Sequence, residues 1–223
     1  MNGNDGEVGR KYPRTRHLPD SPGATDDDKI LPDLDGFAGE LVVTEKMDGG
    51  NVTFTRDTMY ARSLDSGTQA WDRACKAVWG RVAHDIPPGW RISGESMWAR
   101  RSVGYRDLPG VYLVFGVWDA GHTLLGWDDT VEWAALLGLP LVPLLYRGGD
   151  LTAARSAWSH QRDEECSEGF VLRSAGPVPE SEFGRRVGKW VRAGHVRTAA
   201  TWRQRDDFAL NGFVDIAGSR PEA

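Results

Sequence analysis

The stretch TEKMDGGN, residues 44–51, places Lys46 between two carboxylates and follows it with a pair of glycines. The apolar run before it indicates a strand over residues 41–46, and Gly49-Gly50 predicts a turn into a second strand over residues 52–56. A lysine at the end of a strand is usually an exposed edge residue, and Lys-x-Asp-Gly alone occurs by chance in roughly a few per cent of chains of this length. The function of Lys46 therefore has to be decided by the segments that accompany it.

Length and composition fit one globular domain, because 223 residues with 40% hydrophobic and 26% charged residues can bury a real core. The net charge of -5 argues against a protein that coats nucleic acid through bulk charge. No apolar stretch approaches the roughly 20 residues that a membrane span needs, and the polar amino terminus lacks the apolar core of a secretory signal. Cys75 and Cys166 form neither a disulfide framework nor a metal-ligand spacing. We therefore expect a protein of the reducing cytoplasm, without membrane contact.

Periodicity along the rest of the chain predicts alternating strands and helices. Further strands are expected over residues 59–63, 90–98, 111–118, 141–146, 169–173 and 187–192. Helices are expected over residues 69–84, over residues 151–161, and from Asp128 or Asp129, whose carboxylate would cap the helix, to about Gly138. Short strands with helices between them and hairpin-length turns favour an α+β fold of mostly antiparallel sheet flanked by helices.

Composition divides the chain into three parts. Residues 1–30 are rich in Gly, Pro and Asp and are predicted to form an irregular N-terminal arm, residues 31–205 carry the periodic elements of the domain, and residues 206–223 form a C-terminal tail. Within the domain, residues 184–205 hold seven basic side chains and no acidic one, namely Arg185, Arg186, Lys189, Arg192, Arg197, Arg203 and Arg205. From charge alone, a solvated surface and a nucleic-acid-binding surface are equally open.

Four strand-like segments downstream of Lys46 each carry a charged or aromatic residue that a plain core strand would not need. They are ISGES (residues 92–96), YLVFGVWD (residues 112–119), SEGFVLR (residues 167–173) and VGKWVR (residues 187–192). Together with Lys-x-Asp-Gly, and in this order, they resemble the motifs of the covalent nucleotidyltransferases, the superfamily of ATP-dependent DNA ligases, RNA ligases and mRNA capping enzymes. The resemblance covers residues of about 40 to 197, in effect a whole catalytic domain.

Three details make the chain most similar to an RNA ligase. Asn51 stands after Lys-Met-Asp-Gly-Gly where DNA ligases and capping enzymes usually have Arg, and Glu45 precedes the lysine as in the phage-type RNA ligases. Too few residues follow Arg192 for the oligonucleotide-binding (OB) barrel that DNA ligases and capping enzymes append, or for the helical domain of some RNA ligases. KYPRTRHLPDSPG near the start and GKWVRAGHVRT near the end also resemble short bacterial and phage RNA-ligase-domain proteins. The resemblance implies that residues 31–205 form an adenylyltransferase (ligase adenylation) domain without an appended OB domain.

The resemblance also implies roles for individual residues. Lys46 would be the nucleophile that attacks ATP and carries AMP, and Lys189 would hold the α-phosphate. Glu168 and Glu95 would serve a divalent cation, Mg²⁺ or Mn²⁺, with the ribose as the alternative ligand of Glu95. Phe115 would stack on adenine, and Glu45 would recognise the adenine amino group. The catalytic residues would be Lys46, Glu168 and Lys189. The implied nucleotide-binding set is Glu45, Asn51, Arg62, Glu95, Phe115, Lys189 and Arg192, and the implied RNA-binding set is Arg185, Arg186, Arg197 and Arg203.

An amine attacks phosphorus only when it is unprotonated, so the pKa of Lys46 must fall from its usual value of about 10.4. Lys189, Arg192 and a divalent cation are the candidates for the positive charge that would lower it. Many RNA ligases carry two lysines one residue apart in this last motif, whereas here Arg192 follows Lys189 by three positions. In a strand these two side chains point to opposite faces, which would leave Lys189 to serve alone.

The function implied is that of an ATP-dependent RNA ligase that joins RNA 3′-OH and 5′-phosphate ends through a lysyl-AMP and an RNA-adenylate, as in RNA repair. A DNA ligase or guanylyltransferase of the same superfamily stays open as an alternative. So does a nucleotide- or RNA-end-binding module without catalysis, working inside a repair complex. The five histidines form no constellation in the sequence and receive no role.

If residues 184–205 bind RNA, replacing Arg197 and Arg203 together will weaken RNA binding and flatten its dependence on salt, because fewer counterions are released. Self-adenylylation will stay intact, because neither residue is assigned to the nucleotide. Measurements of RNA binding over a salt series, beside adenylylation of the same protein, check both statements. Loss of the two activities together would mean that this segment is structural.

Overall fold

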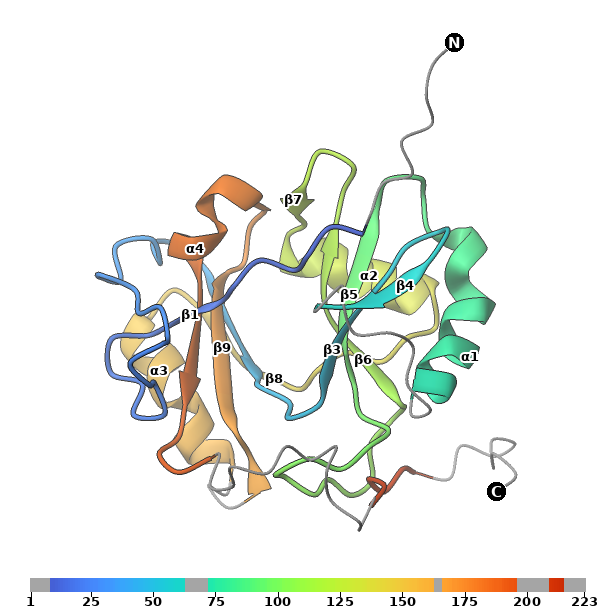
Figure 1. Cartoon of the computed structure of the whole chain (residues 1–223). Coiled ribbons are helices and arrows are strands. Elements are labelled where there is room, and N and C mark those ends of the chain that lie inside the picture. The colour runs from blue at the N-terminus through green and yellow to red at the C-terminus, as the bar shows by residue number, and fades with distance from the viewer. Residues whose placement is uncertain (1–8, 63–71, 163–165, 196–208, 215–223) are drawn as a thin grey trace.

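The computed structural model describes residues 9–62, 72–162, 166–195 and 209–214. Two β-sheets face each other, and helices cover their outer faces (Figure 1). One sheet has five strands in the order β1-β11-β9-β2-β8, and the other has six in the order β10-β7-β6-β5-β3-β4. All pairings among these strands are antiparallel apart from the parallel pair of β1 and β11. The expected α+β fold of mostly antiparallel sheet flanked by helices is therefore confirmed.

The elements of the described residues have the following bounds. The five-stranded sheet contains β1 (Arg16–His17), β2 (Leu41–Glu45), β8 (Leu144–Gly148), β9 (Gly169–Ser174) and β11 (Val187–Val191). The six-stranded sheet contains β3 (Gly50–Phe54), β4 (Met59–Ala61), β5 (Arg91–Ser96), β6 (Tyr112–Trp118), β7 (Thr123–Leu124) and β10 (Val178–Pro179). The helices are α1 (Asp72–Val82), α2 (Trp127–Leu136), α3 (Leu151–Gln161) and α4 (Phe183–Arg186), with short 3-10 turns at η1 (Ala83–Asp85) and η3 (Glu180–Glu182). No helix in this described part of the chain has both the length and the apolar character that a membrane crossing requires.

Each sheet presents one face to its helices and the other to the opposite sheet. Helix α3 covers the outer face of the five-stranded sheet, where Ala154 and Trp158 pack with Leu41 and Val43 of β2 (Figure 1). Helices α1 and α2 cover the six-stranded sheet in the same way. Val42, between the two outward-facing residues of β2, joins an apolar cluster between the sheets. The two-residue alternation of a strand therefore decides which side chains of β2 can take part in a site between the sheets.

The stretch TEKMDGGN carries the chain from one sheet to the other. β2 pairs with β8 and β9, whereas β3, which begins at Gly50, pairs with β4 and β5. The two strands that flank the predicted turn therefore belong to different sheets. A Cβ at Gly49 would collide with the carbonyl oxygen of Ser96, so only glycine lets the backbone pass this close to β5. Lys46, the first residue after β2, is thereby placed between the two sheets.

Helix α3 spans the residues predicted for it. Its N-cap is Asp150, whose Oδ1 accepts hydrogen bonds from the backbone N–H of Thr152 at 2.8 Å and of Ala153 at 3.1 Å. Helix α1 lies within the predicted range of residues 69–84, and the 3-10 turn η1 follows it directly. Residues 69–71 of that prediction lie outside the described residues.

The capping prediction for helix α2 is wrong. The N-cap is Gly126, which offers no side-chain hydrogen bond. Asp128 instead forms an ion pair with Arg147 of β8, with Oδ1 2.5 Å from Nη1. The end of the helix is as predicted, because Gly138 follows it with a φ of 63°. The strand expected over residues 141–146 begins later than predicted, at the first residue of β8.

The described part of the N-terminal arm connects both sheets. β1 pairs in parallel with β11, and the N–H of Leu18 donates to the carbonyl of Lys189 at 2.8 Å. A Cβ at Gly188 would lie 2.6 Å from Cδ2 of Leu18, so the arm packs directly on the backbone of β11. Toward the six-stranded sheet, Arg10 forms an ion pair with Glu180 at 2.9 Å. The division of the chain after residues 30 and 205 stays a prediction.

Gly169 opens β9, and a Cβ at this position would collide with the carbonyl oxygen of Trp190 on β11. Replacing Gly169 by alanine is expected to lower the free energy of unfolding by about 2 kcal/mol or more, because the collision forces the two strands apart. Gly176→Ala is the matched control, since no atom lies within 4 Å of a Cβ there, and it should change the free energy by less than about 1 kcal/mol. Urea unfolding followed by tryptophan fluorescence measures both. Equal losses in the two variants would contradict this packing.

Candidate active site

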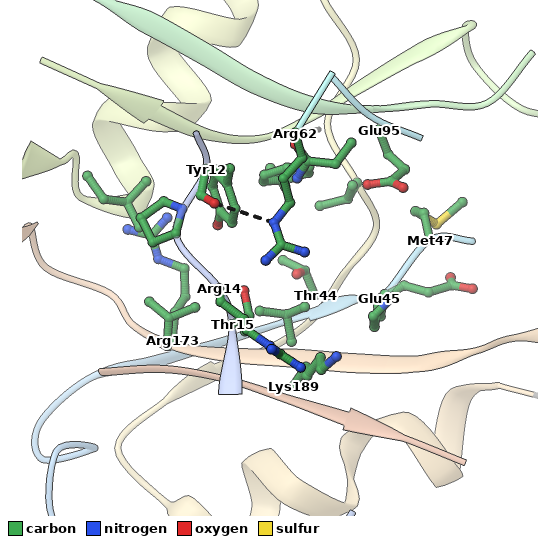
Figure 2. Close-up of a pocket in the computed structure, with 18 of the residues that line it drawn as sticks. Tyr12, Arg14, Thr15, Thr44, Glu45, Met47, Arg62, Glu95, Arg173 and Lys189 are labelled. Carbon is green, nitrogen blue, oxygen red and sulfur yellow. Dashed lines mark hydrogen bonds between the residues drawn. The ribbon is translucent and has the colours of Figure 1, made fainter. Parts of the chain in front are cut away.

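A cavity of about 380 Å³ lies between the two sheets (Figure 2). Seven of the predicted site residues line it, namely Glu45, Lys46, Asn51, Arg62, Glu95, Phe115 and Lys189. The arm contributes Tyr12, Pro13, Arg14, Thr15 and Asp28. Figure 2 shows Arg62 and Glu95 on one side of the cavity and Thr44 and Lys189 on the other. The fold thus brings residues of all five sequence motifs to one cavity, because Val171 and Arg173 of the segment SEGFVLR line it, and Glu168 of the same segment adjoins it through Lys46.

Lys46 reaches this cavity with its Nζ 2.6 Å from Oε1 of Glu168. Its backbone N–H donates to the carbonyl of Gly169 at 2.9 Å, which fixes Lys46 beside the start of β9. Burial alone would lower the pKa of Lys46, but the carboxylates of Glu168, Glu95 and Asp48 outweigh burial and raise this pKa above its usual value. In the protein alone the amine is therefore an ammonium. The lowering of this pKa that attack on ATP requires, with Lys189, Arg192 and a divalent cation as its candidate causes, stays a prediction.

Lys189 reaches the cavity from β11. Its Nζ lies 3.8 Å from Oδ1 of Asp28, and burial together with the charge of Lys46 lowers the pKa of Lys189. Asp28 is itself held by Thr25, whose backbone N–H and hydroxyl both donate to Oδ2. The two lysines therefore bring two positive charges to one cavity, an arrangement suited to phosphate oxygens.

Asn51 and Glu95 are cross-strand neighbours on β3 and β5. Oδ1 of Asn51 is buried and has no hydrogen-bond partner among the described residues. Burial raises the pKa of Glu95 to about 7, although the charge of Lys46 opposes this shift. An acceptor without a partner and a carboxyl group that titrates near neutrality are both typical of a site that binds a polar ligand.

The opposite end of the cavity is aromatic and holds a buried arginine. Phe115 of β6 and Tyr12 of the arm meet edge to face, with ring centroids 5.2 Å apart. Arg173 of β9 lines this end (Figure 2), is buried, and has an Nη1 without a hydrogen-bond partner among the described residues. Burial lowers the pKa of Arg173 to about 10. Sequence reasoning missed Tyr12 and Arg173, although the two-residue spacing of Arg173 from Val171 puts both on the same face of β9.

The carboxylate of Glu45 is engaged on the α3 side of the five-stranded sheet. Alternation along β2 places this side chain on the same face as Val43. One of its oxygens accepts a hydrogen bond from Nε of Arg162 at 2.6 Å, and the other accepts one from the hydroxyl of Ser167 at 2.9 Å. The predicted contact of Glu45 with adenine stays a prediction, and it would require these two hydrogen bonds to be given up.

Arg192 does not line the cavity. Its Nε donates to the carbonyl of Ser167 at 2.9 Å, while Lys189 points into the cavity, as strand alternation predicts for the pair. Arg62 does line the cavity, and its Nε donates to the carbonyl of Tyr12 at 3.4 Å (Figure 2). Of the two residues, Arg62 is therefore the better placed for a nucleotide.

The predicted RNA-binding residues lie away from the cavity or outside the described chain. Arg185 is exposed in α4, and Arg186 forms an ion pair with Glu182 at 2.9 Å. Arg197 and Arg203 lie outside the described residues. Their assignment to RNA stays a prediction.

Asp48 and His195 lie next to Glu168 and Lys46, although the sequence indicated no role for either residue. Nε2 of His195 lies 3.7 Å from Oδ1 of Asp48 and 3.5 Å from Oε1 of Glu168. The sequence signal for Asp48 is its place in Lys-x-Asp-Gly. For His195 it is only the resemblance of GKWVRAGHVRT to other short ligase-domain proteins, because residues this far apart show no spacing pattern.

A sequence profile of the family described as RNA ligase matches residues 39–191. The chain belongs to the RNA ligase family. The matched region extends from just before β2 to the end of β11 and includes Lys46, Glu168 and Lys189. A search of curated protein sequences found no match to this RNA ligase family member.

Solved structures of longer proteins share the fold of this RNA ligase family member. An archaeal ATP-dependent RNA ligase is 18% identical with a TM-score of 0.52, and the match covers 82% of this chain and 48% of that one. The Naegleria gruberi RNA ligase with PPi is 15% identical with a TM-score of 0.56, over 86% of this chain and 58% of that one. A putative ATP-dependent DNA ligase from Aquifex aeolicus is 19% identical with a TM-score of 0.50, over 70% of this chain and 44% of that one. The expected ligase-type nucleotidyltransferase fold is confirmed, and this chain spans about half the length of these proteins.

Glu95→Gln tests the buried carboxyl group. The pKa of Glu95 is about 7 in the folded protein against an ordinary value of 4.5, so the folded state binds the proton more tightly than the unfolded chain does. The stability that this proton contributes is complete below the unfolded pKa and is lost as the pH rises through 7. From about pH 5 to about pH 8.5, the wild type should therefore lose about 2 kcal/mol of unfolding free energy relative to Glu95→Gln.

Urea unfolding of both proteins over this pH range, with a chelator present, measures the difference. Glu132→Gln removes an exposed carboxylate on α2 and controls for the loss of one charge. Parallel stability curves for the wild type and Glu95→Gln would show that the carboxyl group is not held neutral by burial.

Proposed function

We propose that this protein is an ATP-dependent RNA ligase that joins RNA 3′-OH and 5′-phosphate ends through a covalent lysyl-AMP. The observation that carries the proposal is the position of Lys46 within the matched RNA ligase region. Its Nζ lies 2.6 Å from Glu168, at a cavity that Lys189 also lines. The scaffold of the two sheets thus holds the nucleophilic amine of Lys46, the carboxylate of Glu168 and the ammonium group of Lys189 close together.

In the first step, Nζ of Lys46 attacks the α-phosphorus of ATP, an N–P bond forms, and the bond to the pyrophosphate oxygen breaks. The ammonium must first lose a proton, and Oε1 of Glu168, at 2.6 Å, is positioned to accept it. Lys189 faces the same cavity and would stabilise the negative charge that develops on the α-phosphate oxygens. The product is AMP bound to Lys46, with pyrophosphate released.

The two later steps reuse the same AMP position. An oxygen of an RNA 5′-phosphate attacks the phosphorus of AMP, and the N–P bond to Lys46 breaks. An RNA 3′-hydroxyl then attacks the 5′-phosphate, a phosphodiester bond forms, and AMP leaves. Lys46 accepts a proton when its bond to phosphorus breaks, which restores the ion pair with Glu168.

The two ends of the cavity suit the two ends of the nucleotide. The base would lie against Phe115 at the aromatic end, where Nη1 of Arg173 offers a donor without a partner among the described residues. At the other end, the carboxylates of Glu168 and Glu95 fit Mg²⁺ or Mn²⁺, and the partnerless Oδ1 of Asn51 fits a water or hydroxyl donor. When bound, such a cation supplies positive charge to the phosphate oxygens. A variant of the Naegleria gruberi RNA ligase has been solved with ATP and Mn, which supports this pairing of ligands.

The choice of RNA as substrate is supported by the family match rather than by the cavity. Repair of broken RNA in the cytoplasm is the role that this activity would serve. A DNA ligase is the second candidate, supported by the fold shared with the putative Aquifex aeolicus DNA ligase. Sealing of matched RNA and DNA substrates with 3′-OH and 5′-phosphate ends separates the two.

Incubation with ATP labelled at the α-phosphate and with Mg²⁺ or Mn²⁺, followed by a denaturing gel, tests the covalent step. The wild type should retain the label, and Lys46→Ala should retain less than about 1% of it, because the variant has no nucleophile. Lys76→Ala, which removes an exposed lysine of α1, should be labelled like the wild type. Labelling from GTP in place of ATP would point to a guanylyltransferase. An absence of label in folded, AMP-free wild type would refute the proposal and favour a non-catalytic nucleotide- or RNA-end-binding module.

A further inference from the structure

One carboxylate oxygen of the N-terminal arm has three nitrogen atoms around it at the wall of the cavity. Oδ1 of Asp28 lies 3.4 Å from Nη2 of Arg14 and 3.8 Å from Nζ of Lys189. Nε2 of His17 lies 3.5 Å from the same oxygen. Arg14, Asp28 and Lys189 line the cavity, and Figure 2 shows Arg14 and Lys189 on the same side of it. The arm therefore brings an anion and a further cation to the wall from which Lys189 projects.

Asp28 is a fixed negative charge that none of these nitrogens contacts closely. Its Oδ2 accepts hydrogen bonds from the backbone N–H and the hydroxyl of Thr25 at 3.2 Å and 3.0 Å, so the arm itself holds the carboxylate. Burial alone would raise the pKa of Asp28, but the hydrogen bonds from Thr25 and the charge of Lys189 lower it. Charge-assisted hydrogen bonds are usually about 2.7–2.9 Å long, shorter than all three distances at Oδ1. The several oxygens of a phosphate group would reach these nitrogens more closely than one carboxylate oxygen does.

The chain is anchored on both sides of Arg14. Before it, Arg10 pairs with Glu180 at 2.9 Å, and the carbonyl of Arg10 accepts a hydrogen bond from the hydroxyl of Tyr60 on β4 at 3.0 Å. After it, β1 pairs with β11, so the arm crosses from one sheet to the other (Figure 1). The side chain of Arg14 is 46% exposed, and its Nη2 also donates to the carbonyl of Asp27 at 2.8 Å. Arg14 thus presents a guanidinium group from a fixed backbone at the open side of the cavity.

We propose that Arg14 binds the β- and γ-phosphates of ATP, and that Asp28 is the internal anion that these phosphates displace from Arg14. The inference rests on the proposed function, in which Lys46 attacks the α-phosphorus. In an in-line displacement the leaving pyrophosphate lies opposite the attacking amine, and it has to depart through the open side of the cavity. A guanidinium group there can bind two phosphate oxygens at once, and it stabilises the charge that pyrophosphate gains as its bond to the α-phosphorus breaks.

This assignment gives the arm a part in nucleotide selection. Arg14 would distinguish ATP from AMP, because AMP lacks both of the phosphates that Arg14 contacts. The negative charge of Asp28 opposes the same phosphates, so its removal should strengthen their binding. The arm precedes residues 39–191, so both contacts come from outside the region that the family profile matches.

Calorimetric titration with α,β-methylene-ATP and Mg²⁺ tests the site without transfer of AMP, because the P–C bond of this analogue does not break. Arg14→Gln should weaken binding of the analogue by at least about ten-fold and change binding of AMP by less than about two-fold. Arg14→Lys keeps the charge and loses the two-point contact, so its affinity should lie between those of Arg14→Gln and the wild type. Asp28→Asn should bind the analogue at least about three-fold more tightly, because a like charge is removed.

Arg16→Gln and Asp26→Asn are the matched controls. Arg16 belongs to the same arm, but its Nε lies against α4, 3.3 Å from the position of a Cβ at Gly184. Asp26 is exposed and lies outside the lining of the cavity. Both variants should bind the analogue as the wild type does, and thermal unfolding shows which variants are folded.

A folded Arg14 variant that binds the analogue as tightly as the wild type, or that loses AMP binding to the same extent, would overturn the proposal. So would Asp28→Asn that binds the analogue no more tightly, because a purely structural role of Asp28 predicts weaker binding. Weaker binding of 5′-phosphorylated RNA alone would show that Arg14 serves the RNA instead. None of these results would affect lysyl-AMP formation by the wild type. Wild type that forms no lysyl-AMP, while the variants bind as expected, would refute the proposed function and leave the phosphate site standing.

Discussion

The site depends on the crossing of the chain between the sheets within the four residues that separate β2 from β3. So short a connection leaves the backbone little freedom, and both of its ends are fixed. Lys46 is held by the carbonyl of Gly169 at the start, and Gly49 passes against the carbonyl of Ser96 at the end. The nucleophile of the proposed reaction is therefore carried by main chain that belongs to both sheets. Any change in the separation of the sheets moves Lys46 relative to every other residue of the cavity.

The charged groups of this cavity suit it to bind phosphates, and their burial costs free energy when no phosphate is bound. Asp48, Glu95 and Glu168 surround Lys46, and together they raise its pKa, while burial raises the pKa of Glu95 itself. Such groups stabilise one another only as a set, because removal of one partner leaves the others buried and unpaired. A nucleotide adds negative charge to this set and a cation adds positive charge, so the protonation of Lys46 is decided by all of them together.

The sequence predicted the elements well and the contacts between distant elements less well. Helix α3 and its end residues followed from local periodicity, and the opposite orientation of Lys189 and Arg192 followed from the two-residue repeat of a strand. The same repeat turns Glu45 toward Arg162, but this could not be foreseen without knowing which face of β2 meets α3. The capping of α2 failed because Asp128 pairs with Arg147, a contact between separate elements. His195 was missed for the same reason, since only the pairing of β9 with β11 brings it to Glu168.

The strand order also determines how late in synthesis each strand meets its neighbours. In the five-stranded sheet β1 lies beside β11, and β2 lies between β8 and β9, so the neighbours of the earliest strands are the last to leave the ribosome. Contacts between such distant segments form slowly, because a long loop must close before any of them is made. Until β8 and β9 emerge, both edges of β2 lack these partners and can pair with other chains. The strand order that gathers the active-site residues thus leaves β2 without its neighbours during the early part of synthesis.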